Sequence, residues 1–414
     1  FQTEAPDNIQ ASFAAFCAKQ AFWLEDYALF TSLKAHFAHE RALGKGENDW
    51  ITFSQNTDNL LSDEEKQAYF ASACWNSWPS ALRKRNGNTL KKWSRLLADA
   101  ITEEKFYQYL FSVQWQALKA YANAKGISII GDTPIFTAYD SADVWAQQPL
   151  FQLDSKGFPT VVSGVPPDYF CADGQLWGNP LYQWKAHKKT DYLWWTNRIR
   201  KALEDVDYLR IDHFRAFESH WEVPFGAPNA IQGEWKKGPG IDFFHTLRRL
   251  LGDLPLIAED LGIITDEVRA LREEAGFPGM RILQFAFGND KNNAYLPHMC
   301  DKNSIMYSGT HDNDTTLGWY ASATEAEKDH YRRYLNVDGQ DAAWDFIRLA
   351  FASPAVFAIV PLQDVLNLDS HYRMNRPGIS EGNWAFRFHW GQWHAGYTEG
   401  LYYLATLFGR YPER

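Results

Sequence analysis

The chain has 414 residues, of which 45% are hydrophobic and 22% are charged, and its net charge at neutral pH is −10. This composition excludes a disordered or fibrous protein, because it supplies enough apolar residues for a large buried core. The excess of acidic residues argues against nucleic acid as a partner, since nucleic-acid binders present a basic face to phosphates.

The cysteines and the hydropathy pattern predict a cytoplasmic protein. The cysteines are scattered and none forms a C-x-x-C pair, so the sequence indicates neither a zinc site nor a disulfide framework. No run of about 18 apolar residues is present, and the first residues show no basic stretch followed by an apolar one. We therefore expect no membrane association.

The first part of the chain is predicted to be mostly helical. Residues 62–78 follow a helical pattern, and Ser62 and Glu65 are spaced as a capping box. A further helix is expected to open at Thr102, with two glutamates in its first turn, and to stop near Gly126. We predict a mostly helical subdomain over about residues 1–125.

After residue 126, short apolar segments alternate with helical ones. The expected strands are ISIIGDTPIF (127–136), VDYLRID (206–212), LPLIAED (254–260), MRILQFAF (280–287), NSIMYSGT (303–310) and VFAIVPLQD (356–364). Helical segments such as TDEVRALREEAG (265–276) lie between several of them. Near-continuous apolar strands separated by helices indicate parallel β/α units that are buried on both faces.

Charged residues at the ends of these strands decide between two parallel folds. They are Asp132, Arg210, Asp212, Glu259, Asp260, His311 and Asp312. The glycine-rich nucleotide loops that usually accompany a doubly wound sheet are absent from the sequence. Polar residues at the ends of many strands are typical of a barrel, so we predict an α/β fold of the (β/α)8 TIM-barrel type, as a single domain over residues 1–414.

The residue types at the strand ends suit glycoside chemistry. Arg210 and Asp212 are two apart and point to the same side of a strand, where the arginine would keep the carboxylate ionised and oriented as a nucleophile. Glu259 follows apolar residues, and a poorly solvated carboxyl can donate a proton. Asp312 could bind sugar hydroxyls, so the three carboxyls together predict cleavage of a glycosidic bond.

Each of these motifs also has a plainer interpretation. Arg210 and Asp212 could be a structural ion pair, and the acidic pair Glu259–Asp260 could cap a following helix. The cluster HDND (311–314) could be a turn or a cation site. Their occurrence together at successive strand ends favours the catalytic interpretation.

A long aromatic segment is expected to close over the site. Residues 164–184, GVPPDYFCADGQLWGNPLYQW, contain Tyr169, Phe170, Trp177, Tyr182 and Trp184. We interpret it as a lid without regular structure, within an insertion of about residues 150–190, whose aromatic rings stack on a ligand. The glycine-rich segment IQGEWKKGPG (231–240) is either a second wall of the site or a surface loop.

Several long phrases resemble one enzyme family. GDTPIFTAYDSADVW, GVPPDYF, GQLWGNPLYQW, YLRIDHFRAF, WEVP, KKGPG, IAEDLG, MRILQFAF and GTHDNDTTLGWY follow one another as in the 4-α-glucanotransferases of the amylomaltase, or disproportionating-enzyme, family. The matching motifs run from about Trp75 to Trp384 and cover most of the chain.

The resemblance implies a substrate class and a set of site residues. It implies a transfer of α-1,4-glucan segments between malto-oligosaccharides, or from starch or glycogen, with no metal and no other cofactor. By its RIDHFR, AEDLG and THDND motifs, Asp212 would be the nucleophile that forms a covalent glucosyl-enzyme, Glu259 the acid/base and Asp312 the stabiliser of the transition state. The same resemblance implies that the sugar is contacted by Arg210, His311, Asp168, Gln175, Trp177, Asp132 and Asn383.

The start of the chain departs from the family pattern. Members of the family begin the barrel with a Pro/Gly/Ser-rich stretch and two early strands, which residues 1–61 do not resemble. A barrel of eight strands cannot close with six, because the open edges would expose its core. We therefore expect the first strands of the barrel to lie before Phe1.

Three rival functions remain. A hydrolase of the α-amylase type would use the same three carboxyls, and a catalytically silent glucan-binding protein would not need them intact. A binuclear metal hydrolase would need an H-x-H pair, which the sequence lacks. For a retaining glucanotransferase, the carboxyls of Asp212 and Glu259 should lie about 5–5.5 Å apart at one mouth, against about 6.5–9.5 Å in an inverting enzyme.

Overall fold

The computed structural model describes residues 6–58, 60–167, 172–288, 290–379 and 381–411. The chain forms two compact units. Unit 1 comprises Phe1–Leu256 with Thr265–Ala275, and unit 2 comprises Ile257–Ile264 with Gly276–Arg414. Within the described residues, no helix is both long and apolar enough to cross a membrane.

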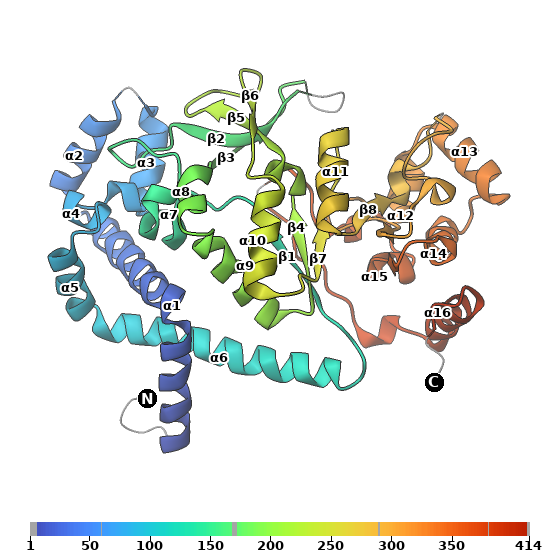
Figure 1. Cartoon of the computed structure of the whole chain (residues 1–414), viewed down its shortest axis with the longest axis horizontal. Coiled ribbons are helices and arrows are strands. Elements are labelled where there is room, and N and C mark those ends of the chain that lie inside the picture. The colour runs from blue at the N-terminus through green and yellow to red at the C-terminus, as the bar shows by residue number, and fades with distance from the viewer. Residues whose placement is uncertain (1–5, 59, 168–171, 289, 380, 412–414) are drawn as a thin grey trace. The chain divides into compact units, whose positions relative to one another are not determined.

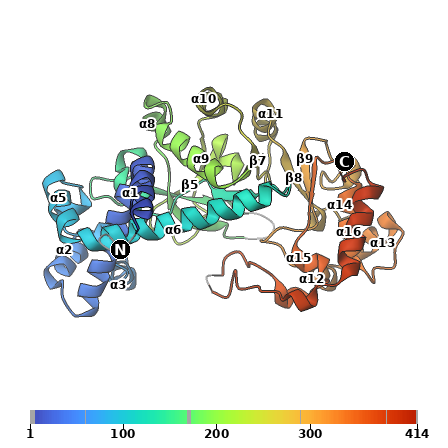
Figure 2. The same ribbon diagram turned by 90° about the horizontal axis from the view of Figure 1, so that it is seen from below.

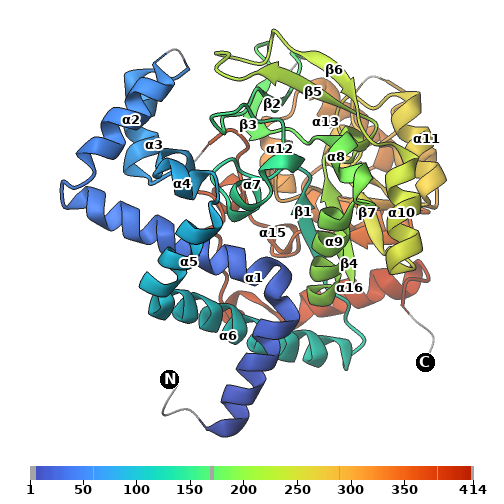
Figure 3. The same cartoon turned by 60° about the vertical axis from the view of Figure 1, so that its left-hand side comes forward.

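The first part of unit 1 is helical. Its helices are α1 (Asp7–Ala42), α2 (Glu47–Thr57), α3 (Asp63–Ala71), α4 (Ser80–Arg83), α5 (Gly87–Leu96) and α6 (Ala98–Asn123). The long helices α1 and α6 cross and pack together through aromatic rings, with the Phe13 and Phe106 centroids 5.8 Å apart (Figure 3). The side chains that α1 buries include Leu24, Ala28 and Leu33.

The helix boundaries correct two predictions. Ser62 caps α3 as predicted, and its capping box with Glu65 is formed, but the helix ends at Ala71 and not near residue 78. Ala73 has a positive φ of 53°, which a continuing helix does not tolerate. Thr102 does not open α6, which begins at Ala98, because its hydroxyl donates to the Ala98 carbonyl one turn back and does not cap.

A parallel sheet follows the helical region in the order β1-β4-β7. Its strands are β1 (Ile130–Pro134), β4 (Tyr208–Asp212) and β7 (Leu256–Ala258), and the boundary between the two units falls inside β7. β1 and β4 pair in a register that sets Asp132 beside Arg210. The covering helices α9 (Leu193–Asp205), α10 (Ile241–Leu251) and α11 (Asp266–Ala275) lie side by side (Figure 2).

An antiparallel sheet of unit 1 occupies two segments that were predicted to be irregular. Its order is β3-β2-β5-β6, formed by β2 (Val161–Val165), β3 (Gln175–Pro180), β5 (Ser219–Pro224) and β6 (Glu234–Lys237). The helices α7 (Ala142–Ala146) and α8 (Trp184–Lys189) flank it in sequence. The prediction of a lid without regular structure is therefore wrong for β3, and the glycine-rich segment 231–240 contains β6. Pairing with distant strands, which no local pattern reveals, satisfies their backbone groups.

Unit 2 contains a second parallel sheet, in the order β10-β9-β8. Its strands are β8 (Gly279–Ile282), β9 (Ser304–Tyr307) and β10 (Phe357–Ile359). The helices of this unit are α12 (Thr316–Ser322), α13 (Glu325–Leu335), α14 (Ala342–Ala352), α15 (Leu362–Val365) and α16 (Ala395–Leu407). Phe287, Tyr331 and Phe346 are buried at the centre of its core.

The predicted parallel β/α units are confirmed. Each of the six strands expected from the sequence is present, and α11 fills the helical segment predicted at 265–276 (Figure 1). The strands form two parallel sheets of three strands each, so an α/β fold is established. The (β/α)8 barrel and the division into one domain with insertions stay predictions.

Candidate active site

A buried arginine joins two carboxylates on neighbouring strands of unit 1. Arg210, on β4, is only 8% exposed, and its Nη2 lies 3.0 Å from Oδ1 of Asp212 at the end of the same strand. Its Nη1 lies 2.5 Å from Oδ2 of Asp132 on β1. A buried guanidinium requires charged partners, and the register of β1 and β4 supplies two. Asp132, Arg210 and Asp212 are therefore brought together, as the sequence predicted for Arg210 and Asp212.

The side chains of both carboxylates remain accessible. The exposed fraction is 41% for Asp132 and 45% for Asp212, whereas Ile211 between Arg210 and Asp212 is fully buried. This alternation follows from the strand geometry, which places residues 210 and 212 on one side and residue 211 on the other. Asp212 is thus an oriented carboxylate that a ligand can reach.

Trp177 and His213 form an aromatic wall near Asp212. His213 follows Asp212 directly and has a left-handed backbone with φ of 54°, and its ring lies 4.7 Å from that of Trp177 in an edge-on contact. Burial lowers the pKa of His213, so the ring is neutral at physiological pH. Gln175 accepts a hydrogen bond from the Trp177 indole at 3.2 Å, on the same strand β3. His213 was not assigned a role from the sequence, although its position next to Asp212 is a usable signal.

The structure separates the aromatic residues of the predicted lid. Trp177 is 38% exposed and can offer a ring to a ligand, but Tyr182 is only 2% exposed and donates its hydroxyl to the Ile135 carbonyl at 2.6 Å. Trp184 stacks on Trp195 inside the same aromatic core. The interpretation of Tyr182 and Trp184 as stacking rings of a lid is therefore wrong, because core packing uses them. Asp168, Tyr169 and Phe170 lie outside the described residues.

In unit 2, Glu259 and Asp260 follow β7 and have different partners. Asp260 accepts a hydrogen bond from the Met280 backbone N–H at 2.6 Å and lies 3.4 Å from the Arg281 guanidinium, so it anchors β8. Glu259 is 9% exposed and accepts a hydrogen bond from the Leu261 N–H at 2.9 Å. Of the two adjacent carboxyls, Asp260 serves the sheet, which leaves Glu259 as the better candidate for chemistry.

Asp312 lies in the loop that follows β9, and side chains from that loop and from a distant loop hold it. Its Oδ1 accepts a hydrogen bond from the Asn375 amide at 2.6 Å, and its Oδ2 lies 3.2 Å from Nε2 of His311. The Arg373 guanidinium donates to its backbone carbonyl at 2.6 Å. Asn375 and Arg373 were not predicted from the sequence, because they are more than 60 positions away and no local pattern links them to Asp312.

Asn383, which was predicted to contact the glucan, and its neighbour Trp384 lie in a loop of unit 2. Trp384 is 62% exposed, and its ring lies 5.1 Å from that of His311. Asn383 accepts a hydrogen bond from the Arg376 N–H at 2.9 Å and donates one to the Ile379 carbonyl at 2.7 Å. Asn383 therefore closes a turn beside Trp384, and its predicted contact with the glucan stays a prediction.

The polar cluster HDND has internal hydrogen-bond partners. Asn313 accepts from the Thr310 N–H at 2.9 Å, and Asp314 accepts from the Ser370 hydroxyl at 2.7 Å. Among the residues with described positions, no group of three or more His, Cys, Asp or Glu side chains could hold a metal ion. The polar side chains of Asn313 and Asp314 therefore stabilise the loop that carries Asp312.

Comparison with known proteins assigns the chain to a family. The sequence model described as 4-alpha-glucanotransferase matches residues 1–392. The chain belongs to the 4-alpha-glucanotransferase family. Asp212, Glu259 and Asp312 all lie within the matched residues.

Individual members of the 4-alpha-glucanotransferase family match nearly the whole chain. The enzyme named 4-alpha-glucanotransferase from Thermus thermophilus is 45% identical over 94% of this chain and 72% of its own length. The enzyme of that name from Synechocystis sp. is 43% identical over 99% of this chain and 75% of its own length. The solved amylomaltase from Streptococcus agalactiae, a complex with acarbose, matches with a TM-score of 0.86 and 33% identity over 98% of this chain and 75% of that chain. The predicted family is thus confirmed.

Proposed function

We propose that this protein transfers α-1,4-glucan segments from a donor malto-oligosaccharide, starch or glycogen chain to the 4-hydroxyl of an acceptor glucan or of glucose. The observation that carries the proposal is the family match over residues 1–392, which includes all three predicted carboxyls. The Streptococcus agalactiae amylomaltase, which shares this architecture, was solved with acarbose bound. The substrates are accordingly α-glucan oligosaccharides.

The proposed reaction is a retaining double displacement. Asp212 attacks the anomeric carbon of the donor sugar while Glu259 protonates the departing glycosidic oxygen, which gives a covalent glucosyl-aspartate and a shortened glucan. Glu259 then takes the proton from the 4-hydroxyl of the acceptor, which attacks the same carbon and releases Asp212. The number of glycosidic bonds is unchanged. The proposal is supported by the accessible, braced carboxylate of Asp212 and by the low exposure of Glu259.

Asp312 is proposed to bind the sugar hydroxyls as the ring flattens in the transition state. The amide of Asn375 and the ring of His311 hold its two oxygens, so its position is fixed before substrate arrives. The other proposed contacts with the glucan are made by Arg210, His311, Asp132, Gln175, Trp177, Asp168 and Asn383. Two observations support these contacts. The accessible Asp132 shares Arg210 with Asp212, and the accessible ring of Trp177 contacts His213, which follows Asp212.

The finer architecture and the location are part of the same proposal. We propose a fold of the (β/α)8 barrel type, supported by the two parallel sheets and by the likeness to the Streptococcus agalactiae amylomaltase. A cytoplasmic location is proposed from the scattered cysteines and the hydropathy pattern. Neither a metal nor another cofactor enters the proposed steps.

Product analysis with maltotriose tests the proposal. Transfer predicts glucose together with a ladder of longer α-1,4 chains and no net rise in reducing ends, and the reaction should proceed in the presence of a metal chelator. Chromatography and a reducing-end assay measure both quantities. A steady rise in reducing ends with only glucose and maltose as products would contradict transfer and support the α-amylase type of hydrolase. Unchanged maltotriose would support a silent glucan-binding protein.

A further inference from the structure

A cavity in unit 1 lies apart from the predicted site residues of that unit. The helices α1, α7 and α9 enclose a volume of about 540 Å³, which is within the usual range of small-molecule pockets, about 300–1,000 Å³. Its described lining residues do not include Asp132, Arg210 or Asp212. The cavity therefore needs its own explanation.

The walls of this cavity are aromatic. Phe22 and Trp23 come from α1, and Trp194 comes from α9. Phe22 is 48% exposed, so its ring is accessible to a ligand. The Trp23 indole donates to Gln20 at 2.7 Å, and the Trp194 indole donates to Asp143 at 3.2 Å. Both indole N–H groups are thus used inside the protein, and what the rings offer to a ligand is apolar surface.

The polar groups of the cavity carry balanced charge. Asp26 and Asp143 line it together with Arg198 and Lys201, so the lining charges cancel. Asp26 pairs with Arg85 at 2.6 Å, and Arg198 donates to the Pro134 carbonyl at 2.6 Å. The amides of Gln147 and Asn197 also line the cavity, and an amide can both donate and accept hydrogen bonds. Aromatic faces, amides and no net charge suit a neutral ligand that is rich in hydroxyl groups.

We propose that this cavity binds a malto-oligosaccharide segment of a long α-1,4-glucan, at a distance along the chain from the bond that is cleaved. The inference rests on the proposed function, which makes such glucans the substrate. A charged metabolite would add a net charge to a lining whose own charges cancel. A purely apolar ligand would bury the Gln147 amide without offering it a hydrogen bond. A glucan segment presents both an apolar ring face and hydroxyl groups.

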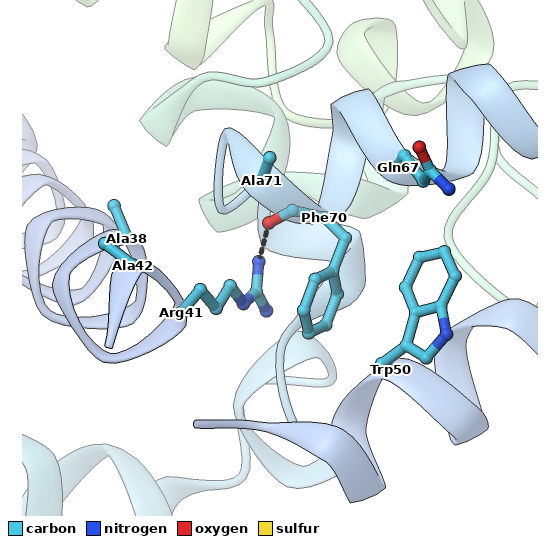
Figure 4. A pocket seen from close by; sticks show the side chains of 7 residues that line it. All are labelled: Ala38, Arg41, Ala42, Trp50, Gln67, Phe70 and Ala71. Carbon is cyan, nitrogen blue, oxygen red and sulfur yellow. Dashed lines mark hydrogen bonds between the residues drawn. The ribbon is translucent and has the colours of Figure 1, made fainter. Parts of the chain in front are cut away.

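A second cavity in unit 1 provides a matched control. It is lined by α1, α2 and α3, has a similar volume of about 550 Å³, and contains Trp50 and Phe70 (Figure 4). The guanidinium of Arg41, which lines this cavity, already donates hydrogen bonds to the Phe70 carbonyl and, at 2.8 Å, to the Ser77 hydroxyl. Among the described residues that line it, Gln67 is the one with a side-chain amide. Removing its tryptophan therefore changes an aromatic cavity of equal size without touching the proposed glucan pocket.

Hydrogen exchange with maltoheptaose as the probe tests the inference on the whole chain. We expect the probe to slow amide exchange in residues 20–27 and 190–201 of the unmodified protein and of Trp50→Ala. In Phe22→Ala and in Gln147→Ala this protection should weaken, and the ratio of the KM for amylose to the KM for maltotriose should rise about three- to tenfold. Two variants of different chemistry guard against a folding defect in either one.

The possible outcomes separate the pocket from the enzyme activity. Absence of protection in 20–27 and 190–201 of the unmodified protein, with a normal maltotriose ladder, overturns the pocket and leaves the proposed function. Protection without any ladder supports the pocket and overturns the proposed function. An equal loss of amide protection in Trp50→Ala and Phe22→Ala also overturns the proposed glucan pocket, because the protection would then not depend on the residues that line it.

Discussion

Asp212 in unit 1 ends a parallel strand and Asp312 in unit 2 follows one, but different kinds of partner hold them. Asp212 is braced by the buried guanidinium of Arg210, which sits on a rigid strand and also binds Asp132. Asp312 is held by the amide of Asn375 and the ring of His311, both of which lie on loops. An ion pair on a strand suits a group that has to stay ionised, whereas the contacts from the loops fix the two oxygens of Asp312 in place.

The largest effect should come from Asp212 itself. Asp212→Asn keeps the shape of the side chain but removes the proposed nucleophile, so kcat should fall by about 10⁴-fold or more while the melting temperature changes little. Product formation from maltotriose and thermal melting measure the two effects. Asp253→Asn, at an exposed position of the same unit, is the control and should act as the unmodified enzyme does. Near-normal turnover by Asp212→Asn would exclude it as the nucleophile.

Removal of the brace should have the next largest effect. Arg210→Ala leaves Asp212 without its ion pair and shifts its carboxyl, so kcat/KM should fall by about 10²-fold. Arg210→Lys should restore only part of this loss, because an ammonium cannot hold Asp132 and Asp212 in the same fork geometry. Arg269→Ala removes an exposed ion pair with Asp266 in unit 1 and serves as the control. Full activity in Arg210→Ala would show that Asp212 does not need the brace.

Acid should weaken unit 1 more than unit 2. His187 in unit 1 is fully buried, and burial lowers its pKa to about 4, below the unfolded value of about 6.5. Its contribution to stability is therefore complete above pH 6.5 and is lost as the pH falls towards 4, which amounts to about 2 kcal/mol between pH 7 and pH 5.

One buried carboxyl of unit 2, that of Asp364, should respond to acid in the opposite direction. Burial raises the pKa of Asp364, so protonation relieves a cost of folding and does not create one. Amide exchange at pH 7 and at pH 5, corrected for the intrinsic rate, should show faster opening in unit 1, and His187→Gln should reduce this difference. Equal loosening of both units with and without His187 would contradict the assignment to this histidine.

The smallest effect on activity is expected from the loop residue Asn375, which holds Asp312. Asn375→Ala removes one hydrogen bond to the Asp312 carboxylate, which should lower kcat/KM about tenfold, while His311 still holds the other oxygen. Initial rates with maltotriose measure the change. The control is Asn303→Ala in unit 2, whose amide makes a long contact of 3.4 Å with the Gly276 carbonyl. A loss as large as that of Arg210→Ala would mean that the two carboxylates are equally dependent on their partners.

The sequence predicted those parts of the molecule that local patterns encode. The six parallel strands follow from short apolar runs, and Arg210 and Asp212 follow from the two-residue period of a strand. The partners of Asp312 could not be predicted, because Asn375 reaches it from 63 positions away. The same limit applies to β2, whose antiparallel pairing with β5 is a tertiary event, and to Tyr182, which a local pattern cannot distinguish from an exposed ring.

The sharing of Arg210 between two carboxylates has a consequence for charge during turnover. In the proposed reaction Asp212 forms an ester with the sugar and loses its negative charge, so a guanidinium paired with it alone would become an isolated buried cation. Asp132 stays bound to the other end of Arg210, so the strand pair keeps one anion for its one cation in the covalent intermediate. In the free enzyme the side chains of Asp132, Arg210 and Asp212 together carry two negative charges and one positive charge. Formation of the ester removes the excess negative charge. The second aspartate thus acts as a standing counter-ion that spares the intermediate an electrostatic penalty.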